Sequence, residues 1–114
     1  MLRLKQRWQF LRVASAGQKF VTPSLIVQAF QNEEDNKRQV LRVGYTASKK
    51  VGGAIERNRT KRRLRSAAEE IMPKHARLGY DFVLIGRKGT LKMKFPKIIK
   101  DLKTALKNLE TYIE

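Results

Sequence analysis

The sequence lacks several of the residues on which other functional classes depend. It contains no cysteine, which excludes disulfide bonds, thiol catalysis and thiolate zinc sites. Its single histidine, His75, cannot build a metal site with a second histidine or a cysteine. No apolar run exceeds four residues, too short to span a bilayer or form a signal-peptide core. We therefore expect a cytoplasmic protein with no metal site and no membrane partner.

Acidic residues are also few, and they are kept apart from the basic ones. The chain holds 26 Lys and Arg against 10 Asp and Glu, a formal net charge of +16. Residues 49–65 hold eight bases and one acid, and so do residues 87–107. This segregation is typical of a protein that binds a phosphate backbone. The alternatives are a solvated charged helix and a membrane-surface patch, although a membrane helix needs a large apolar face opposite its bases.

The rest of the composition is that of one folded domain. Apolar residues make up 41% of the 114 residues, enough for one core but not for two. The apolar patterns predict an α+β fold over residues 1–114, in the order α-β-β-β-α-β-α. About four strands form a mixed sheet packed with three helices. The helices are expected at 4–16, from 48–53 to about 72, and 95–112, and the longer strands at 24–30, 39–46 and 80–87.

Turn residues refine these boundaries. Gly17 is expected to end the first helix and Pro73 to end the second. Pro23 separates a short strand beginning at Phe20 from the longer strand that follows. Because the polar residues 31–38 join two long strands, we expect residues 24–46 to form a β-hairpin with an acidic tip.

The second helix has two contrasting faces. At about 100° per residue, its small and apolar residues form one narrow stripe suited to packing on a sheet: Thr60, Leu64, Ala67, Ala68 and Ile71. The rest of its circumference is almost entirely cationic. Like charges four residues apart, such as Lys61 and Arg65, destabilise a helix, whereas a phosphate ligand would remove the repulsion. Lys49, Lys50, Gly52 and Gly53 precede this helix, whose free N–H groups favour an anion.

Residues 48–65, SKKVGGAIERNRTKRRLR, resemble the signature of the bacterial ribonuclease P protein family. That signature is a lysine pair, a glycine, an alanine and then Arg-Asn-Arg, followed by a basic helix. The matching residues are Lys49, Lys50, Gly52, Ala54, Arg57, Asn58 and Arg59, with Lys61, Arg62 and Arg65 following in step. The resemblance extends to LKQRWQFLRVASAG at 4–17, RVGYTASKK at 42–50 and DFVLIGR at 81–87.

The resemblance implies a left-handed βαβ crossover, against the usual right-handed rule. It also implies that one protein joins one large catalytic RNA, and that the two remove the 5′ leader of precursor tRNA, with Mg²⁺ held mainly by the RNA. DNA is not an expected partner. Contact with the catalytic RNA is implied for Lys49, Lys50, Arg57, Asn58, Arg59, Lys61, Arg62 and Arg65. Contact with the single-stranded leader, in a cleft between the first helix and the sheet, is implied for Phe10, Val13 and Gln28.

Two features depart from the family pattern. Thr60 stands where a branched apolar residue is usual, so we expect its methyl group in the core and its hydroxyl bonded back to the helix. Ala14 and Gln28 stand where the family often has aromatic residues. Base stacking should then depend on Phe10, with Gln28 offering hydrogen bonds.

The first helix carries two apolar sets. Phe10 and Val13 lie on one side, while Leu4, Trp8 and Leu11 are expected to pack the helix. The alternative, that Phe10 and Val13 are ordinary core residues, stays open at this point.

No residues suit catalysis by the protein itself. A protein nuclease needs paired carboxylates for metal ions or a histidine base, but the only clustered acids are residues 33–35, in a predicted loop, and His75 lies in a connector. We therefore expect an accessory subunit of an RNA enzyme. The competing hypotheses are a structural RNA-binding protein of the ribosome, which needs no leader cleft, and a DNA-binding domain, which needs polar base-reading side chains.

Overall fold

The computed structural model describes residues 1–32 and 40–114 and has an α+β fold built on a five-stranded sheet. The strands are β1 (Leu2–Arg3), β2 (Gln18–Val21), β3 (Leu25–Gln31), β4 (Arg42–Ala47) and β5 (Tyr80–Gly86), arranged β1-β4-β5-β3-β2. The helices are α1 (Arg7–Ala16), α2 (Ala54–His75), α3 (Lys88–Lys92) and α4 (Phe95–Asn108), with a 3₁₀ turn at Lys49–Val51. The predicted class and mixed sheet are confirmed, with one more strand and one more short helix than expected.

The central position of β5 overturns one prediction. It pairs antiparallel with β3 and parallel with β4, so residues 24–46 do not form a hairpin. β5 is buried over most of its length, as a strand covered on both faces must be. The strand that forms a hairpin with β3 is instead β2, through a turn in which Thr22 Oγ1 donates to the Leu25 carbonyl at 2.7 Å. The expected acidic tip lies outside the described residues.

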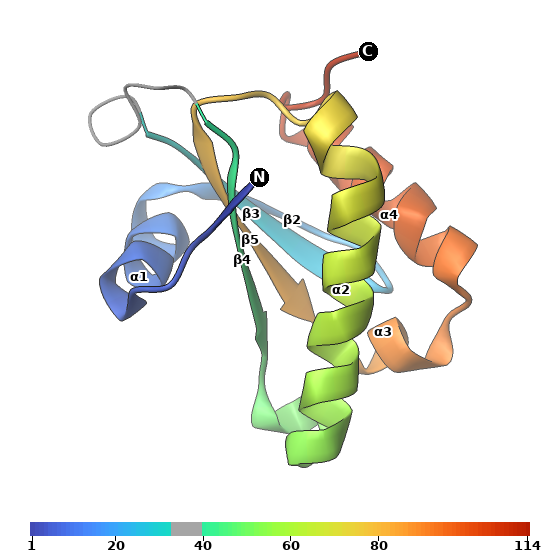
Figure 1. Ribbon diagram of the computed structural model, residues 1–114. Helices are drawn as coiled ribbons and strands as arrows, with labels where there is room; N and C mark the ends of the chain where they lie inside the picture. The colour runs from blue at the N-terminus through green and yellow to red at the C-terminus, as the bar shows by residue number, and fades with distance from the viewer. Residues whose placement is uncertain (33–39) are drawn as a thin grey trace.

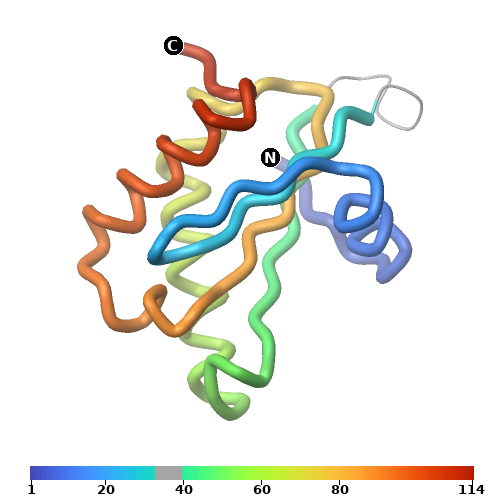
Figure 2. Tube along the Cα trace, turned by 180° about the vertical axis from the view of Figure 1, so that it is seen from behind, coloured from blue at the N-terminus to red at the C-terminus, as the bar shows by residue number. Residues whose placement is uncertain are grey.

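Helices cover both faces of the sheet (Figure 1). α1 lies on one face, and α2, α3 and α4 lie on the other, which the view from behind also shows (Figure 2). The larger core, between the sheet and α2 with α4, includes Leu64, Phe82 and Leu102, and a smaller core lies under α1. In Figure 1 the chain descends β4, ascends α2 on the right and descends β5 behind β4, which makes this crossover left-handed, as the resemblance implied.

α2 packs on the sheet through the predicted stripe. Thr60 donates from Oγ1 to the Glu56 carbonyl at 2.8 Å, and its methyl group faces Gly86 of β5, where any Cβ would collide with it. Both expectations for Thr60 are therefore confirmed. All five stripe residues are buried: Thr60, Leu64, Ala67, Ala68 and Ile71.

The helix ends differ from the predictions by up to one turn. α2 continues through Pro73 to His75, where the sequence predicted that it would stop. Pro73 lacks the N–H for one intrahelical hydrogen bond, but the Ala76 N–H still donates to the Met72 carbonyl at 2.9 Å and closes the last turn. α1 begins at Arg7 rather than at residue 4, since the residues before it extend along β4 as β1. α4 ends at Asn108 rather than at residue 112.

A buried carboxylate attaches α4 to the sheet. Asp101 accepts a hydrogen bond from Ser24 Oγ at 2.7 Å and one from Lys97 Nζ at 2.8 Å. Burial works to raise the pKa of Asp101, but the bonds from Lys97 and Ser24 outweigh it and hold that pKa below its ordinary value. This contact fixes α4 against the start of β3.

Candidate nucleic-acid interface

The residues expected to bind catalytic RNA gather in the 3₁₀ turn at Lys49–Val51 and the first half of α2 (Figure 1). We call them the signature surface: Lys49, Lys50, Arg57, Asn58, Arg59, Lys61, Arg62 and Arg65. Most of these side chains are exposed, and Arg57, Lys61 and Arg65 are half-buried. None of the ion pairs in the described part of the chain involves them. The surface is therefore an unneutralised patch of positive charge.

The bases of α2 do not all serve one surface. Arg63 turns toward the α3–α4 connection, where its Nη2 donates to the Met93 carbonyl at 2.6 Å. Lys61 and Arg65 turn the other way, toward the edge of β4, where the Arg65 guanidinium lies 5.8 Å from the centre of the Tyr45 ring. Arg59 and Arg62 are exposed. The basic side chains that the sequence predicted around α2 thus face different surroundings: the α3–α4 connection, the edge of β4, and solvent.

The start of α2 depends on a glycine. Gly52 has a φ of +143°, a conformation that side chains rarely adopt, and a Cβ there would come within 2.9 Å of the Glu56 side chain. Glu56 is the acidic residue of the first turn, where a carboxylate complements the helix dipole. The favourable position for an anion at this helix end is thus partly occupied by the carboxylate of Glu56, and contact of Lys49 and Lys50 with RNA stays a prediction.

A cavity of about 410 Å³ lies between α1 and the sheet, and we call it the α1 cleft. Phe10 and Gln28, two of the three predicted leader residues, line it together, and Ala14 lines the same side of α1. The Phe10 ring packs directly on the backbone of Gly44, where a Cβ would come within 2.5 Å of ring atom Cε1. A glycine in β4 therefore makes the room in which this ring lies.

The apolar residues of α1 pack differently from the prediction. Val13, the third predicted leader residue, is 1% exposed and packs with Leu4 in the smaller core. Its burial assigns it to the packing of α1, and direct contact with a leader stays a prediction. Trp8 and Leu11, which were expected to pack the helix, are 53% and 54% exposed, so that expectation is wrong for both.

A buried carboxylate of the sheet also contacts α1, beside the apolar packing of Val13. Asp81 of β5 is fully buried and receives two hydrogen bonds from Arg42, at 2.7 and 2.9 Å, and one from Arg12 of α1 at 3.3 Å. The Arg12 guanidinium also lies about 5 Å from the rings of Trp8 and Phe30. Arg12 therefore lies between the sheet and Trp8, and the exposed Trp8 ring covers its guanidinium.

A second cavity adjoins the α1 cleft at the edge of β4, and we call it the edge pocket. It has a volume of about 400 Å³ and shares Phe10 and Tyr45 with the cleft. Burial, followed by the charge of Glu69, raises the pKa of Tyr45 to about 12, against the opposite influence of nearby guanidinium groups. Its phenol is therefore neutral at physiological pH. The basic residues that line the edge pocket are Arg3, Lys5, Lys61 and Arg65.

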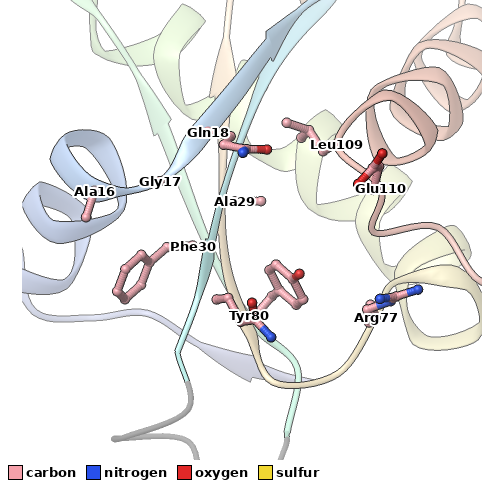
Figure 3. Close-up of a pocket in the computed structure, with 10 residues that line it drawn as sticks. Ala16, Gly17, Gln18, Ala29, Phe30, Arg77, Tyr80, Leu109 and Glu110 are labelled. Carbon is pink, nitrogen blue, oxygen red and sulfur yellow. The ribbon is translucent and has the colours of Figure 1, made fainter.

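Sequence reasoning missed Arg3, Lys5 and Tyr45 as candidate site residues. The available signal was the absence of any acid from residues 1–32, which hold five bases. A larger cavity, of about 610 Å³, lies elsewhere, between the end of α1, β3 and the segment after α4 (Figure 3). None of the predicted site residues lines that cavity; Tyr80 and Arg77 do.

Comparison with known proteins identifies the family. A family model described as Ribonuclease P matches residues 1–110. This chain belongs to the ribonuclease P protein family. It is 47% identical over 108 residues to the ribonuclease P protein component of Paramagnetospirillum magneticum, covering 94% of this chain and 81% of that protein. It is 43% identical to the corresponding protein of Gluconacetobacter diazotrophicus, covering 92% and 88%.

Solved ribonuclease P proteins share the fold. The Staphylococcus aureus protein superposes with a TM-score of 0.81 at 26% identity, covering 99% of both chains. The Thermotoga maritima protein has a TM-score of 0.73 at 24% identity, covering 90% of this chain and 92% of that one. The family match favours a ribonuclease P protein over the ribosomal and DNA-binding alternatives. The signature surface and the α1 cleft are the two features whose role in such a protein needs an explanation.

Two further observations concern the described residues of this ribonuclease P protein. Across 1–32 and 40–114, no three His, Asp or Glu side chains gather where they could hold a metal ion. Over the same ranges, no helix has the length and apolar character needed to cross a membrane.

Proposed function

We propose that this chain is the protein subunit of a ribonuclease P, which binds a catalytic RNA and the 5′ leader of precursor tRNA and assists removal of that leader. We propose further that it works in the cytoplasm, with one protein for each RNA. The observation that carries the proposal is the pairing of two unlike surfaces on one rigid domain. The signature surface is a dense unneutralised positive patch, and the α1 cleft is a small cavity with the rings of Phe10 and Tyr45 in its lining.

The signature surface suits a folded RNA. Its lysines and arginines can neutralise phosphates and release counterions without reading sequence. The side chains of Arg59 and Arg62 are exposed on a helix whose opposite face is locked to the sheet by Thr60 and Leu64. Because this helix is fixed, its charges are presented at a set spacing rather than on a mobile tail.

The α1 cleft suits a single strand. Phe10 offers a ring on which an unpaired base can stack, and Gln28 offers an amide that can both donate and accept hydrogen bonds. A duplex does not splay its bases in this way, so the cleft favours a leader over the body of a tRNA. The contact would raise the affinity of the assembled enzyme for precursor over mature tRNA.

The chemistry is proposed to belong to the RNA subunit. The described residues offer no cluster that fits a metal ion, so no catalytic step is assigned to a metal held by the protein. Mg²⁺ is proposed to be held mainly by the RNA. The contribution of this chain is then to bind, to position the leader and to reduce electrostatic repulsion between two RNAs.

The test is a processing assay. The protein is mixed with the catalytic RNA of ribonuclease P from an organism with a similar protein, such as Paramagnetospirillum magneticum, and with end-labelled precursor tRNA at low Mg²⁺. We expect faster release of the 5′ leader than with RNA alone, and a smaller gain with Arg59→Ala. Lys100→Ala, which removes one exposed charge from α4, is the matched control. No gain from the unaltered protein would refute the proposal.

A further inference from the structure

One aromatic side chain lies on the outside of the molecule. Trp8 of α1 is 53% exposed, and it is the only aromatic residue in the described part of the chain that is mostly exposed. Leu11, three residues later on the same helix, is 54% exposed. Residues three apart are neighbours on a helix surface, so these two form one apolar ridge, which we call the outer ridge. It lies on the side of α1 opposite the buried Val13, and α1 is the outermost element on its face of the sheet (Figure 1).

The Trp8 ring is held from one side. The Arg12 guanidinium lies over it, 4.9 Å from the ring centre, and also lies over the Phe30 ring at 5.1 Å. Arg12 in turn donates to the buried carboxylate of Asp81. Because the guanidinium covers one face of the indole, the exposed surface of Trp8 belongs mainly to the opposite face. A flat ligand that stacks on this face meets a ring that is already fixed, which lowers the entropic cost of binding.

Basic residues surround the outer ridge. Residues 1–32 hold five bases and no acid. Two of these bases, Lys5 and Arg7, are exposed within three residues of Trp8. Arg7 and Leu11 also line the α1 cleft, so the outer ridge continues from the rim of that cleft. An exposed ring beside positive charge is the combination with which proteins bind single-stranded nucleic acid. Two apolar side chains are a small area for a stable protein interface, which buries about 1,200–2,000 Å² in total.

We propose that Trp8 stacks with an unpaired base of RNA that lies outside the α1 cleft. Phe10 and Trp8 lie on different sides of α1, so the two rings take two different bases. A strand that leaves the cleft past Arg7 and Leu11 meets the open face of Trp8. The inference rests on the proposed function in taking RNA as the partner, and it adds a contact that belongs neither to the signature surface nor to the cleft.

Two RNAs could supply this base. Continuity of the outer ridge with the α1 cleft would place the base on the leader. The position of Trp8 on the outside of the domain would also allow a loop of the catalytic RNA to reach it. The stacking chemistry is the same for both, and the experiments below separate the two sources.

The first experiment uses the fluorescence of Trp8, the only tryptophan of the chain. The free protein is titrated with single-stranded oligoadenylate, with oligouridylate of equal length and with inorganic polyphosphate. Binding of each oligonucleotide is followed separately by the anisotropy of a label on the RNA. We expect saturable quenching of Trp8, stronger with adenine because its larger ring stacks better, and no quenching by polyphosphate.

Two results of this titration would overturn the inference. One is an oligonucleotide that binds, by its anisotropy, while the Trp8 emission stays unchanged. The other is a Trp8 emission that changes with protein concentration in the absence of RNA, together with a sedimenting dimer. That result would assign the outer ridge to a second copy of this chain.

The second experiment separates stacking from a structural role of Trp8. Trp8→Leu removes the ring but keeps an apolar residue that favours a helix, and Trp8→Phe keeps a ring. We expect Trp8→Leu to lower the affinity for oligoadenylate about tenfold and Trp8→Phe to retain most of it. Leu78→Ala, which removes another apolar side chain that is 54% exposed, is the matched control and should change nothing.

Melting curves accompany these affinities, because Trp8 also covers the Arg12 guanidinium. With folding intact, an unchanged affinity in Trp8→Leu contradicts the inference. Equal losses in Trp8→Leu and Trp8→Phe also contradict it, since they would show that the side chain acts as a cover and not as a stacking surface.

The third experiment identifies the source of the base. The affinity of Trp8→Leu is measured for the catalytic RNA and, in the assembled enzyme, for precursor tRNA with a long leader and with a leader cut back to a single nucleotide. A loss for the catalytic RNA assigns the base to that RNA. A loss for the long leader alone assigns it to the leader. Equal losses for the two precursors without a loss for the catalytic RNA, or no loss in any affinity, contradict the inference.

The two proposals can fail separately. If the protein does not speed leader cleavage but oligoadenylate still quenches Trp8, the proposed function fails and the stacking role of Trp8 stands. If cleavage is enhanced and Trp8→Leu behaves as the unaltered protein in every assay, the stacking role fails and the proposed function stands.

Discussion

Because Thr60 and Gly86 are in contact, substitutions at these two positions should have non-additive effects on the free energy of unfolding. Gly86→Ala places a methyl group against the Thr60 methyl, which cannot rotate away because its Oγ1 is bonded to the Glu56 carbonyl. Overpacking of this kind costs about 1–3 kcal/mol, partly offset by about 0.4–1 kcal/mol from the stiffer unfolded chain. Thr60→Ser alone removes one buried methyl group and should cost about 1 kcal/mol. In the double variant, the space left by the missing methyl group of residue 60 accommodates the new methyl group of residue 86.

Urea unfolding of the four proteins measures the coupling. We expect the double variant to be more stable than Gly86→Ala alone, with a coupling free energy of about 1–2 kcal/mol. The control combines Gly86→Ala with Thr104→Ser, since Thr104 is exposed on α4, and should be additive. Additivity in the Thr60 pair, or a Gly86→Ala protein as stable as the original, would show that α2 is not seated on β5 through this contact.

Three further outcomes follow from the same structure. The affinity for catalytic RNA should fall as salt rises, with a slope of about −4 to −6 when the logarithm of the binding constant is plotted against the logarithm of the salt concentration. Arg59→Ala should make this slope shallower by about one, as measured by filter binding at several salt concentrations. A slope near zero contradicts the signature surface. Phe10→Ala should lower affinity for precursor tRNA by about 1–3 kcal/mol without changing that for mature tRNA, while equal losses or a collapsed fold would assign Phe10 to the core. Because the folded pKa of Asp101 lies below its ordinary value of 3.8, its contribution to stability is present above that pH and is lost as pH falls through the folded pKa. Asp101→Asn should therefore flatten the fall in unfolding free energy below about pH 4, and an unchanged pH profile would refute the role of the Ser24 and Lys97 bonds.

Periodicity predicted α2 well because its information is local. The stripe from Thr60 to Ile71 depends only on the rotation per residue, and every member is buried. Even the bond from Thr60 back to Glu56 follows from the helix alone. The exposure of Arg59 and Arg62 could be read in the same way, since it follows from their position on the helix opposite the stripe.

The arrangement around α1 could not be predicted in this way, because it depends on partners far away in sequence. Two apolar sets were visible, but which one faces the sheet depends on distant partners, such as Val83, which packs with Val13, and Asp81, which Arg12 contacts. The order of the strands failed for a similar reason. Proximity in sequence favoured pairing β3 with β4, whereas β5, the most buried of the strands described, takes the place between them. The edge pocket is assembled from four separate segments and had no local signal beyond the bases before α1.

The two-residue length of β1 has a consequence for how two RNAs could share this protein. α1 and α2 lie on opposite faces of one sheet (Figure 1), and the α1 cleft adjoins the edge pocket beside Lys61 and Arg65 of α2, past the end of β1. If both surfaces are occupied, the partners are kept apart by a rigid thickness that includes the helix, about 10–12 Å across. The protein then separates its two partners, and the edge of β4 beyond Val43, which β1 leaves unpaired, lies where the two surfaces come nearest to sharing residues.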